Sequence, residues 1–321
     1  MTRIFLTASD AGWEVPADWN NADNTIEVIG EGGLAGVGSA VNGGGGAAGG
    51  GGGAYAKTAN ISLTSGAALV LGTHYQVGAG GSSTDSWFKN NASTTAVLAQ
   101  HGANAIDGAE GLGGKATSSI GDLAYDGGDG GTGVTLLSRR AGAGGGGAAG
   151  PDGPGRKGGA TATPYGRPGA GGAGCNGLSS TDGADTAAVT TGIDGGAGPL
   201  GTGGGKGGTP TSAAEAGSNG GGGGSGQDTT GSRDGASGST YPSWDATHGP
   251  GSAGGGGAGS SSPSTGGNSG DAGTYGAGQS APGCGTVRTG TVGSVGRGLI
   301  VITYTPASSF PSARSFGCVI G

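Results

Sequence analysis

Aromatic and small polar side chains gather in one stretch between glycine runs, Gln227–His248, which reads QDTTGSRDGASGSTYPSWDATH. Tyr241, Trp244 and His248 stand there among Ser, Thr, Asp and Gly. Such rings offer stacking surface at low entropy cost, and the short polar side chains supply hydrogen bonds. The composition predicts contact with a protein or a glycan, and packing of Trp244 on the glycine runs is the alternative. Two further tyrosines are candidates for the same contact, Tyr165 and Tyr275.

Residue types that perform catalysis are present, but their spacing predicts no active site. The three histidines, His74, His101 and His248, lie far apart, and none has the spacing of a metal ligand or of a catalytic triad. Gly-x-Gly-x-x-Gly occurs only where no strand and helix flank it, and the Gly-Lys dipeptides lack the Ser or Thr of a phosphate-binding loop. Acidic pairs such as Asp126 and Asp129 are interpreted as turn residues rather than as the paired carboxylates of a glycosidase. We therefore expect no enzyme, no cofactor and no metal.

Charge and cysteine content exclude several other classes. The chain has 321 residues with 14 basic and 21 acidic side chains, and its net charge of −7 offers no basic stripe for nucleic acid. No apolar run reaches the length of about 18 residues that a membrane helix needs, and the first ten residues lack the pattern of a signal peptide. The odd number and wide spacing of Cys175, Cys284 and Cys318 exclude a disulfide framework. Buried free thiols are favoured over a single bridge.

Glycine dominates the elements that must position these residues: the chain has 89 glycines, most of them in runs that recur from Gly43 to Gly298. Glycine is poor in helices and in strands, so a flexible coil and polyproline-II-type geometry remain. Composition alone favours disorder. Collagen needs glycine only at every third residue, whereas these runs are uninterrupted, so several sides of each threefold helix would have to contact neighbours. Buried peptide groups would then pair between helices. This second interpretation predicts a packed bundle of polyglycine II helices.

Strand-like stretches bracket the runs, which a disordered arm would not require. Alternating or apolar residues mark Arg3–Thr7, Thr25–Gly30 and Gly298–Thr305. We expect a mainly irregular and β fold, in which a small β-region of N-terminal strands and Leu299–Tyr304 closes the glycine bundle. The expected domain covers residues 1–306, with a strand-rich part at 1–88 plus 298–305, a glycine array with loop inserts at 89–297, and a C-terminal tail at 307–321. Two tryptophans are expected to plug the junction between strands and bundle, Trp13 and Trp19.

Three motifs in the chain resemble the glycine-rich domain of bacteriophage tail proteins. They are WEVPADWNNADNTIEVIGEGG from Trp13 to Gly33, GGGGGAYAK from Gly49 to Lys57, and GRGLIVITYTP from Gly296 to Pro306. The chain is also similar in style to the distal-tail adhesins of T-even-like phages, in which polyglycine II helices form a layered sandwich whose connecting segments bind the receptor. It lacks the separate N-terminal attachment domain of those adhesins.

The resemblance implies a tail-fibre or tail-tip protein that displays loops for recognition of a host receptor. Its partners would be other phage tail proteins and a host surface protein or glycan, and it would be oligomeric within the virion. The location would be the virion tail, exposed to the medium, after synthesis in the host cytoplasm. A purely structural virion component, such as a fibre shaft, collar or head-decoration protein, is the alternative, and an ice-binding or adhesive glycine-rich protein is a further rival. Apolar residues of the tail are candidates for docking on the particle, namely Phe310, Phe316, Val319 and Ile320.

Overall fold

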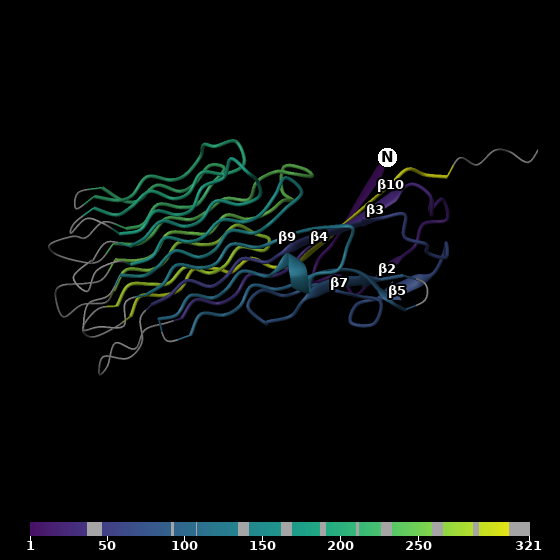
Figure 1. Ribbon diagram of the computed structural model, residues 1–321, viewed down its shortest axis with the longest axis horizontal. Coiled ribbons are helices and arrows are strands. Elements are labelled where there is room, and N and C mark those ends of the chain that lie inside the picture. The colour runs from purple at the N-terminus through teal and green to yellow at the C-terminus, as the bar shows by residue number, and fades with distance from the viewer. Residues whose placement is uncertain are drawn as a thin grey trace, which may run out of the picture.

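The computed structural model places strands at one end of an elongated molecule and extended glycine-rich segments at the other (Figure 1). It describes residues 1–36, 47–90, 93–106, 108–133, 141–161, 169–186, 191–209, 212–225, 233–258, 266–284 and 289–307. Helical structure within these residues is a single 3-10 turn, η1 (Ala116–Ser118). The architecture is therefore irregular and β, with antiparallel sheets, as the sequence predicts.

Strands from both ends of the chain form the main sheet. Its spatial order is β1 (Thr2–Leu6), β10 (Leu299–Tyr304), β3 (Asn24–Ile29), β4 (Tyr55–Ala59) and β9 (Leu123–Tyr125). The C-terminal strand β10 pairs antiparallel with β1 on one side and with β3 on the other. The predicted β-region of N-terminal strands and Leu299–Tyr304 is thus confirmed.

Period-two alternation gives the main sheet two apolar faces. On β10, Ile300 and Ile302 enter one buried cluster, while Leu299 and Val301 enter another. The first cluster packs against two smaller sheets and holds most of the large apolar side chains. The smaller sheets pair β2 (Gly12–Glu14) with β5 (Ala68–Val70), and order β6 (Tyr75–Gln76), β7 (Ser86–Lys89) and β8 (Thr95–Ala99).

Strands β8 and β9 lie beyond residue 88, in the stretch where the sequence predicts glycine array. The β8 sequence TAVLA contains two alanines, and β9 has only three residues, so neither carries a strong strand signal. Both strands are instead stabilised by antiparallel pairing, β8 with β7 and β9 with β4.

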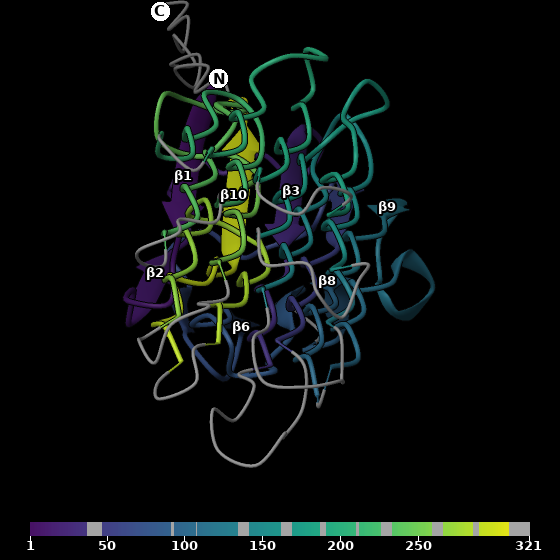
Figure 2. The same cartoon turned by 90° about the vertical axis from the view of Figure 1, so that its left-hand side faces the viewer.

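The glycine-rich segments run side by side along the long axis and are seen from their ends in Figure 2. Segment 47–54 shows how they are held together. Its amides donate in turn to three different segments, and the order repeats after three residues. The acceptors of the six amides from Gly49 to Ala54 are the carbonyls of Gly131, Gln279, Ala103, Gly128, Gly276 and Gln100. Its carbonyls accept from three further segments, through the amides of Gly33, Gly111 and Gly146. One segment is therefore hydrogen-bonded to six neighbours.

Side chains are excluded from the interior of this array by the approach of neighbouring backbones. A Cβ atom built on Gly52 would lie 2.1 Å from the carbonyl oxygen of Gly147, and one on Gly53 would lie 2.0 Å from that of Gly30. Glycine is thus required at these positions for close approach rather than for unusual dihedral angles. Alanine is buried in the array only where a methyl group finds space, as at Ala143 and Ala281.

Asp126 and Asp129 are not turn residues, so that prediction is wrong. Both lie in an extended segment of the array. Asp126 Oδ1 accepts a hydrogen bond of 2.6 Å from the amide of Ala116, and Asp129 Oδ1 accepts one of 2.8 Å from the amide of Gly113. The carboxylates therefore satisfy backbone donors of neighbouring segments at the surface of the array.

Candidate functional site

Residues 241–249, which carry Tyr241, Trp244 and His248, form a loop where the array meets the main sheet, and residues 227–232 of the predicted stretch lie outside the described residues. Segment 233–240 enters the loop and segment 250–258 leaves it, and the amide of Tyr241 donates to the carbonyl of Pro250 at its base. Within the loop, Asp245 Oδ1 accepts hydrogen bonds from the amides of Thr247, at 2.8 Å, and His248, at 2.7 Å. This arrangement is an aspartate-centred turn. The Thr247 amide, followed by the ring of His248, holds the pKa of Asp245 well below its ordinary value.

A buried carboxylate of the sheet joins this loop to the strands. Glu27 lies on β3 and is 7% exposed. Its Oε1 accepts the phenol proton of Tyr55 on β4 at 2.5 Å, and its Oε2 accepts the indole N–H of Trp244 at 3.0 Å. A buried carboxylate without donors would be strongly unfavourable, so the loop and β4 together make this position tolerable. Burial, and then the charge of Glu27, raise the pKa of the Tyr55 phenol far above its ordinary value.

Apolar packing reinforces the same junction. Trp244 and Tyr275, with Ala148 and Ala149 of the array, form one buried cluster with side chains of the main sheet. The sheet side chains in that cluster are Ile29, Tyr55, Leu299 and Val301. The array is thus attached to the sheet through aromatic rings as well as through continuous chain.

A stack of three rings lies beside this cluster. The imidazole of His248 lies against Phe5 of β1, with ring centroids 3.8 Å apart and planes inclined by 8°. On its other side the ring of Tyr275 has its centroid 5.7 Å away. Arg3, two residues before Phe5, donates from Nη1 to the backbone carbonyl of Trp244. Arg3 and Phe5 point to the same face of edge strand β1, and both attach this strand to the loop.

The predicted receptor residues are mostly enclosed by this arrangement. Trp244 is 9% exposed and Tyr275 is 8% exposed, so neither ring offers a free stacking face. His248 is half-buried between two rings, and Tyr241 is half-buried at the base of the loop. The structure therefore brings Trp244, His248 and Tyr275 together, but as an internal junction. Tyr165 and the docking candidates Phe310, Phe316, Val319 and Ile320 lie outside the described residues.

Trp13 and Trp19 occupy a different place from the predicted plug. Trp19 is 5% exposed, and its ring centroid lies 5.1 Å from that of Tyr304. The ring centroid of Trp13 lies 6.0 Å from that of Trp19 and 6.2 Å from that of Phe88. Both pack with the cluster between the main sheet and the smaller sheets, to which the described residues of 126–298 contribute nothing. These tryptophans fill the β core, and the plug position belongs to Trp244 and Tyr275.

A second buried carboxylate, Glu31, fixes another loop to the start of the array. Its side chain is fully buried and accepts hydrogen bonds from the amides of Gly80, at 2.6 Å, and Thr84, at 2.9 Å. Ser82 Oγ donates to the same carboxylate at 2.9 Å. Sequence reasoning missed both Glu27 and Glu31. The sequence does mark both residues: in TIEVIGEGG, Glu27 and Glu31 are the only charged residues in an otherwise apolar and glycine-rich stretch, where a charged side chain is uncommon.

The other two histidines and the described cysteines lie outside this junction. His101 Nδ1 lies 2.6 Å from Asp85 Oδ1, and His74 Nδ1 accepts the amide of Val70. Cys175 is a free buried thiol and Cys284 is also buried, whereas Cys318 lies outside the described residues. Burial raises the pKa of the Cys175 thiol to about 12. Within the described ranges, no group of three His, Cys, Asp or Glu could hold a metal ion. The same ranges contain no helix with the length and hydropathy of a membrane span.

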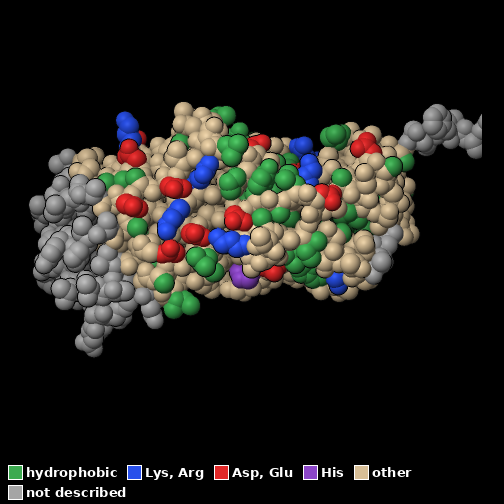
Figure 3. Space-filling model, viewed as in Figure 1, with side chains coloured by type: hydrophobic (Ala, Val, Ile, Leu, Met, Phe, Trp, Pro, Cys, Tyr) green, Lys and Arg blue, Asp and Glu red, His purple; other side chains and the backbone are tan. Residues whose placement is uncertain are grey.

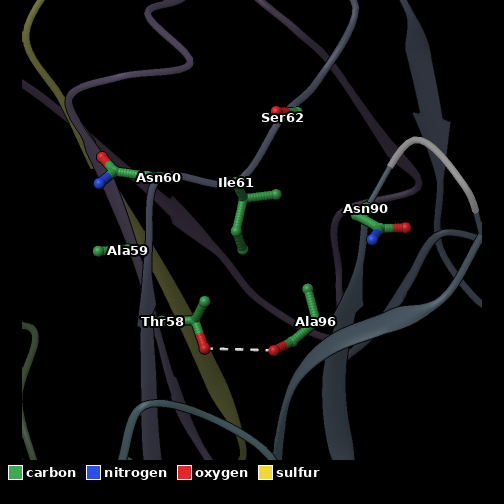
Figure 4. Close-up of a pocket in the computed structure, with 7 residues that line it drawn as sticks. All are labelled: Thr58, Ala59, Asn60, Ile61, Ser62, Asn90 and Ala96. Carbon is green, nitrogen blue, oxygen red and sulfur yellow. Dashed lines mark hydrogen bonds between the residues drawn. The ribbon is translucent and has the colours of Figure 1, made fainter.

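One hollow of about 470 Å³ lies in the β part, between the end of β4 and the start of β8 (Figure 4). Ile61 and Ala96 supply apolar lining, and Thr58 Oγ1 is already bonded to the carbonyl of Ala96 at 3.2 Å. The amide of Asn60 points away from these residues. Polar groups therefore do not converge on one point, and we assign no ligand to this hollow.

Comparison of the chain with protein-family models and with characterised proteins gives no match. The functional interpretation accordingly depends on the residues and geometry described above.

Proposed function

We propose that this chain is a virion component of a bacteriophage tail, a stiff glycine scaffold that displays connecting segments to a host-cell receptor. In this proposal the extended segments are polyglycine II helices packed as a bundle. Support comes from the amides of Gly49, Gly50 and Gly51, which donate to three different neighbours before the order repeats. A left-handed helix with three residues per turn directs successive amides in three directions. This single observation carries the scaffold part of the proposal.

Stiffness would follow from the same bonding. Each segment is tied laterally to several others, so bending one would require breaking bonds to its neighbours. Glycine positions inside the bundle could not change, because the nearest carbonyl oxygens leave no room for a Cβ atom. Connecting segments at the surface carry no such restriction, and binding residues concentrate on such segments in proteins generally. The three sequence motifs that resemble phage tail proteins supply the assignment to a virion. No catalytic step is part of the proposal.

Adsorption of the purified protein to bacterial cells tests the receptor-binding part. If the protein is the tail adhesin, the labelled chain binds cells of susceptible strains saturably and reduces phage adsorption to them. Variants of the aromatic loop must keep the junction intact, so the exposed tip residues Ala246 and Thr247 are the positions to change, with Trp244 left in place. Absence of binding to any susceptible strain by the folded protein would contradict receptor recognition.

The second candidate is a purely structural virion component, in which the surface segments contact neighbouring subunits. Burial of Trp244 and Tyr275 favours it, because the aromatic residues predicted for receptor contact are used internally. Under this alternative, phage particles that lack the protein fail to assemble or are unstable, while the isolated protein does not bind cells. Electron microscopy of such particles and the adsorption assay separate the two candidates.

A further inference from the structure

Polar side chains stand at every third residue along the surface segments of the array. In segment 266–274, two sets of amides donate to backbone carbonyls. Gly267, Gly270 and Gly273 bond to segment 250–258, and Ser269 and Ala272 bond to segment 289–298. The third set, from Asn268, Asp271 and Thr274, bonds to side chains instead. The acceptors are Asp234 Oδ1 at 2.8 Å, Ser237 Oγ at 3.3 Å and Thr240 Oγ1 at 2.8 Å.

The pattern continues onto the next segment. Asn268 Oδ1 accepts the amide of Thr291 at 2.8 Å, and Asp271 Oδ1 accepts the amide of Ser294 at 2.7 Å. Each outward-facing side chain thus bonds the outward-facing amide of its neighbour. The surface-facing amides of segments 266–274 and 289–298 named here are therefore all hydrogen-bonded within the chain.

A second surface of the array repeats the arrangement. In segment 153–161, two sets of amides bond to the backbones of neighbouring segments 126–133 and 169–177. The amides of Lys157 and Ala160 bond instead to Asp182 Oδ1, at 3.0 Å, and Asp185 Oδ1, at 2.7 Å. Figure 3 shows acidic and basic side chains spaced over one face of the array.

Comparison with an interior segment shows what these side chains replace. In segment 47–54 all three sets of amides donate to carbonyls of neighbouring segments. A side-chain oxygen at a surface segment therefore occupies the place of a carbonyl from one more glycine segment.

We propose that these side chains are lateral terminators, which prevent a glycine segment of a second copy of this chain from adding to the array. Removal of one row would leave a groove of the width and bonding pattern that the array itself uses, with unpaired amides along it. The surface would then become a docking face for a glycine segment of a second copy, because the unpaired amides of one copy need carbonyl acceptors from the other. The principle is the one by which exposed strand edges are protected from pairing.

The test removes the row of three acceptors in the triple variant Asp234→Gly, Ser237→Gly, Thr240→Gly. Its mean mass by sedimentation equilibrium is expected to rise above that of the parent protein as concentration rises. Below the concentration of association, the amides of Asn268, Asp271 and Thr274 should exchange roughly tenfold faster than in the parent. The matched control is Asp234→Asn, Ser237→Thr, Thr240→Ser, which keeps every acceptor oxygen and should retain the parent mass and exchange rates.

Two results would overturn the inference. One is a folded triple-glycine variant whose mass equals that of the parent at every concentration, even with faster exchange, because the side chains would then only satisfy amides. The other is association of the control variant to the same extent. If the triple-glycine variant does not fold, Asp182→Gly with Asp185→Gly makes the same test on the second surface, with the same two readouts.

Discussion

At the scale of single residues, Glu27 holds the array and the sheet together. It is a buried carboxylate whose donors come from two distant places, Tyr55 on the adjacent strand and Trp244 in a loop 217 residues later in the chain. A buried charge that loses a donor is strongly unfavourable, whereas one with its donors costs little. Trp244 is therefore important as a hydrogen-bond donor as well as an apolar side chain.

We expect Trp244→Phe to lower the free energy of unfolding by about 1–3 kcal/mol through the lost donor, with a further loss from the smaller ring. Urea unfolding followed by circular dichroism measures the change. Trp13→Phe is the matched control, because Trp13 is a half-buried tryptophan for whose indole N–H the described part of the chain offers no acceptor. Equal destabilisation by both substitutions would show that the bond to Glu27 contributes nothing.

Asp245 gives a pH dependence of known sign. Its pKa in the folded chain lies below the ordinary value of 3.8, because the amide of Thr247 and then the ring of His248 stabilise the carboxylate. The stabilisation is complete above the ordinary value and is lost as pH falls toward the lower folded value. We expect the shift of the Thr247 amide resonance that follows Asp245 protonation to appear only in acid well below pH 3.8, rather than around that value. In Asp245→Asn the acid shift should vanish, and its persistence would assign it to another group.

The composition of the aromatic loop could be predicted from sequence, but its orientation could not. Tyr241, Trp244 and His248 stand out because the surrounding chain contains so few aromatic residues. Whether such rings face solvent or the protein depends on what lies opposite them, and here that is Glu27 and Phe5, more than 200 residues away. No local pattern encodes that proximity.

At the scale of elements, the array depends on backbone contacts that only glycine permits. Gly52 and Gly36 illustrate the two extremes. A Cβ atom on Gly52 would lie 2.1 Å from the carbonyl oxygen of Gly147, whereas one on Gly36 would have its nearest neighbour, an oxygen of Ala105, at 3.4 Å. Two glycines of the same array therefore differ in what they tolerate.

Gly52→Ala is expected to destabilise the chain by about 3 kcal/mol or more, because the overlap must be relieved by separating hydrogen-bonded segments. Gly36→Ala should change the free energy of unfolding by less than about 1 kcal/mol, since its methyl group is accommodated and the unfolded chain loses freedom. Thermal or urea unfolding of the two variants provides the comparison. Similar effects of both substitutions would contradict close packing around Gly52.

The positions of β3 and β10 are predictable from sequence, whereas those of β8 and β9 and the neighbour relations in the array are not. Leu299–Tyr304 and Asn24–Ile29 fall within one residue of the predicted strands Gly298–Thr305 and Thr25–Gly30, because β-branched and apolar residues concentrate there. Runs of glycine carry no side chains to distinguish one run from another. The sequence alone therefore does not tell which glycine segments are hydrogen-bonded neighbours. Asp, Ser, Thr and Asn recur at every third residue in the surface segments. This spacing identifies surface segments in the sequence once the three-residue repeat of the hydrogen bonds is known.

At the scale of the whole molecule, the sheet closes one end of the array. Both chain ends contribute to it, since β1 and β10 pair directly. The strands next to the array continue into it without a break, as β3 does into segment 30–36 and segment 47–54 does into β4 (Figure 1). The sheet therefore fixes the spacing of several glycine segments at once, which lowers the entropy lost when the others join them.

Hydrogen exchange of the glycine amides tests the lateral bonding most directly, since every part of the account depends on it. In the intact protein, the amides from Gly49 to Ala54 should exchange as slowly as those of β10, because both become free only when the chain unfolds as a whole. Exchange of these glycine amides at the rate of an unstructured peptide, while β10 remains protected, would contradict the account.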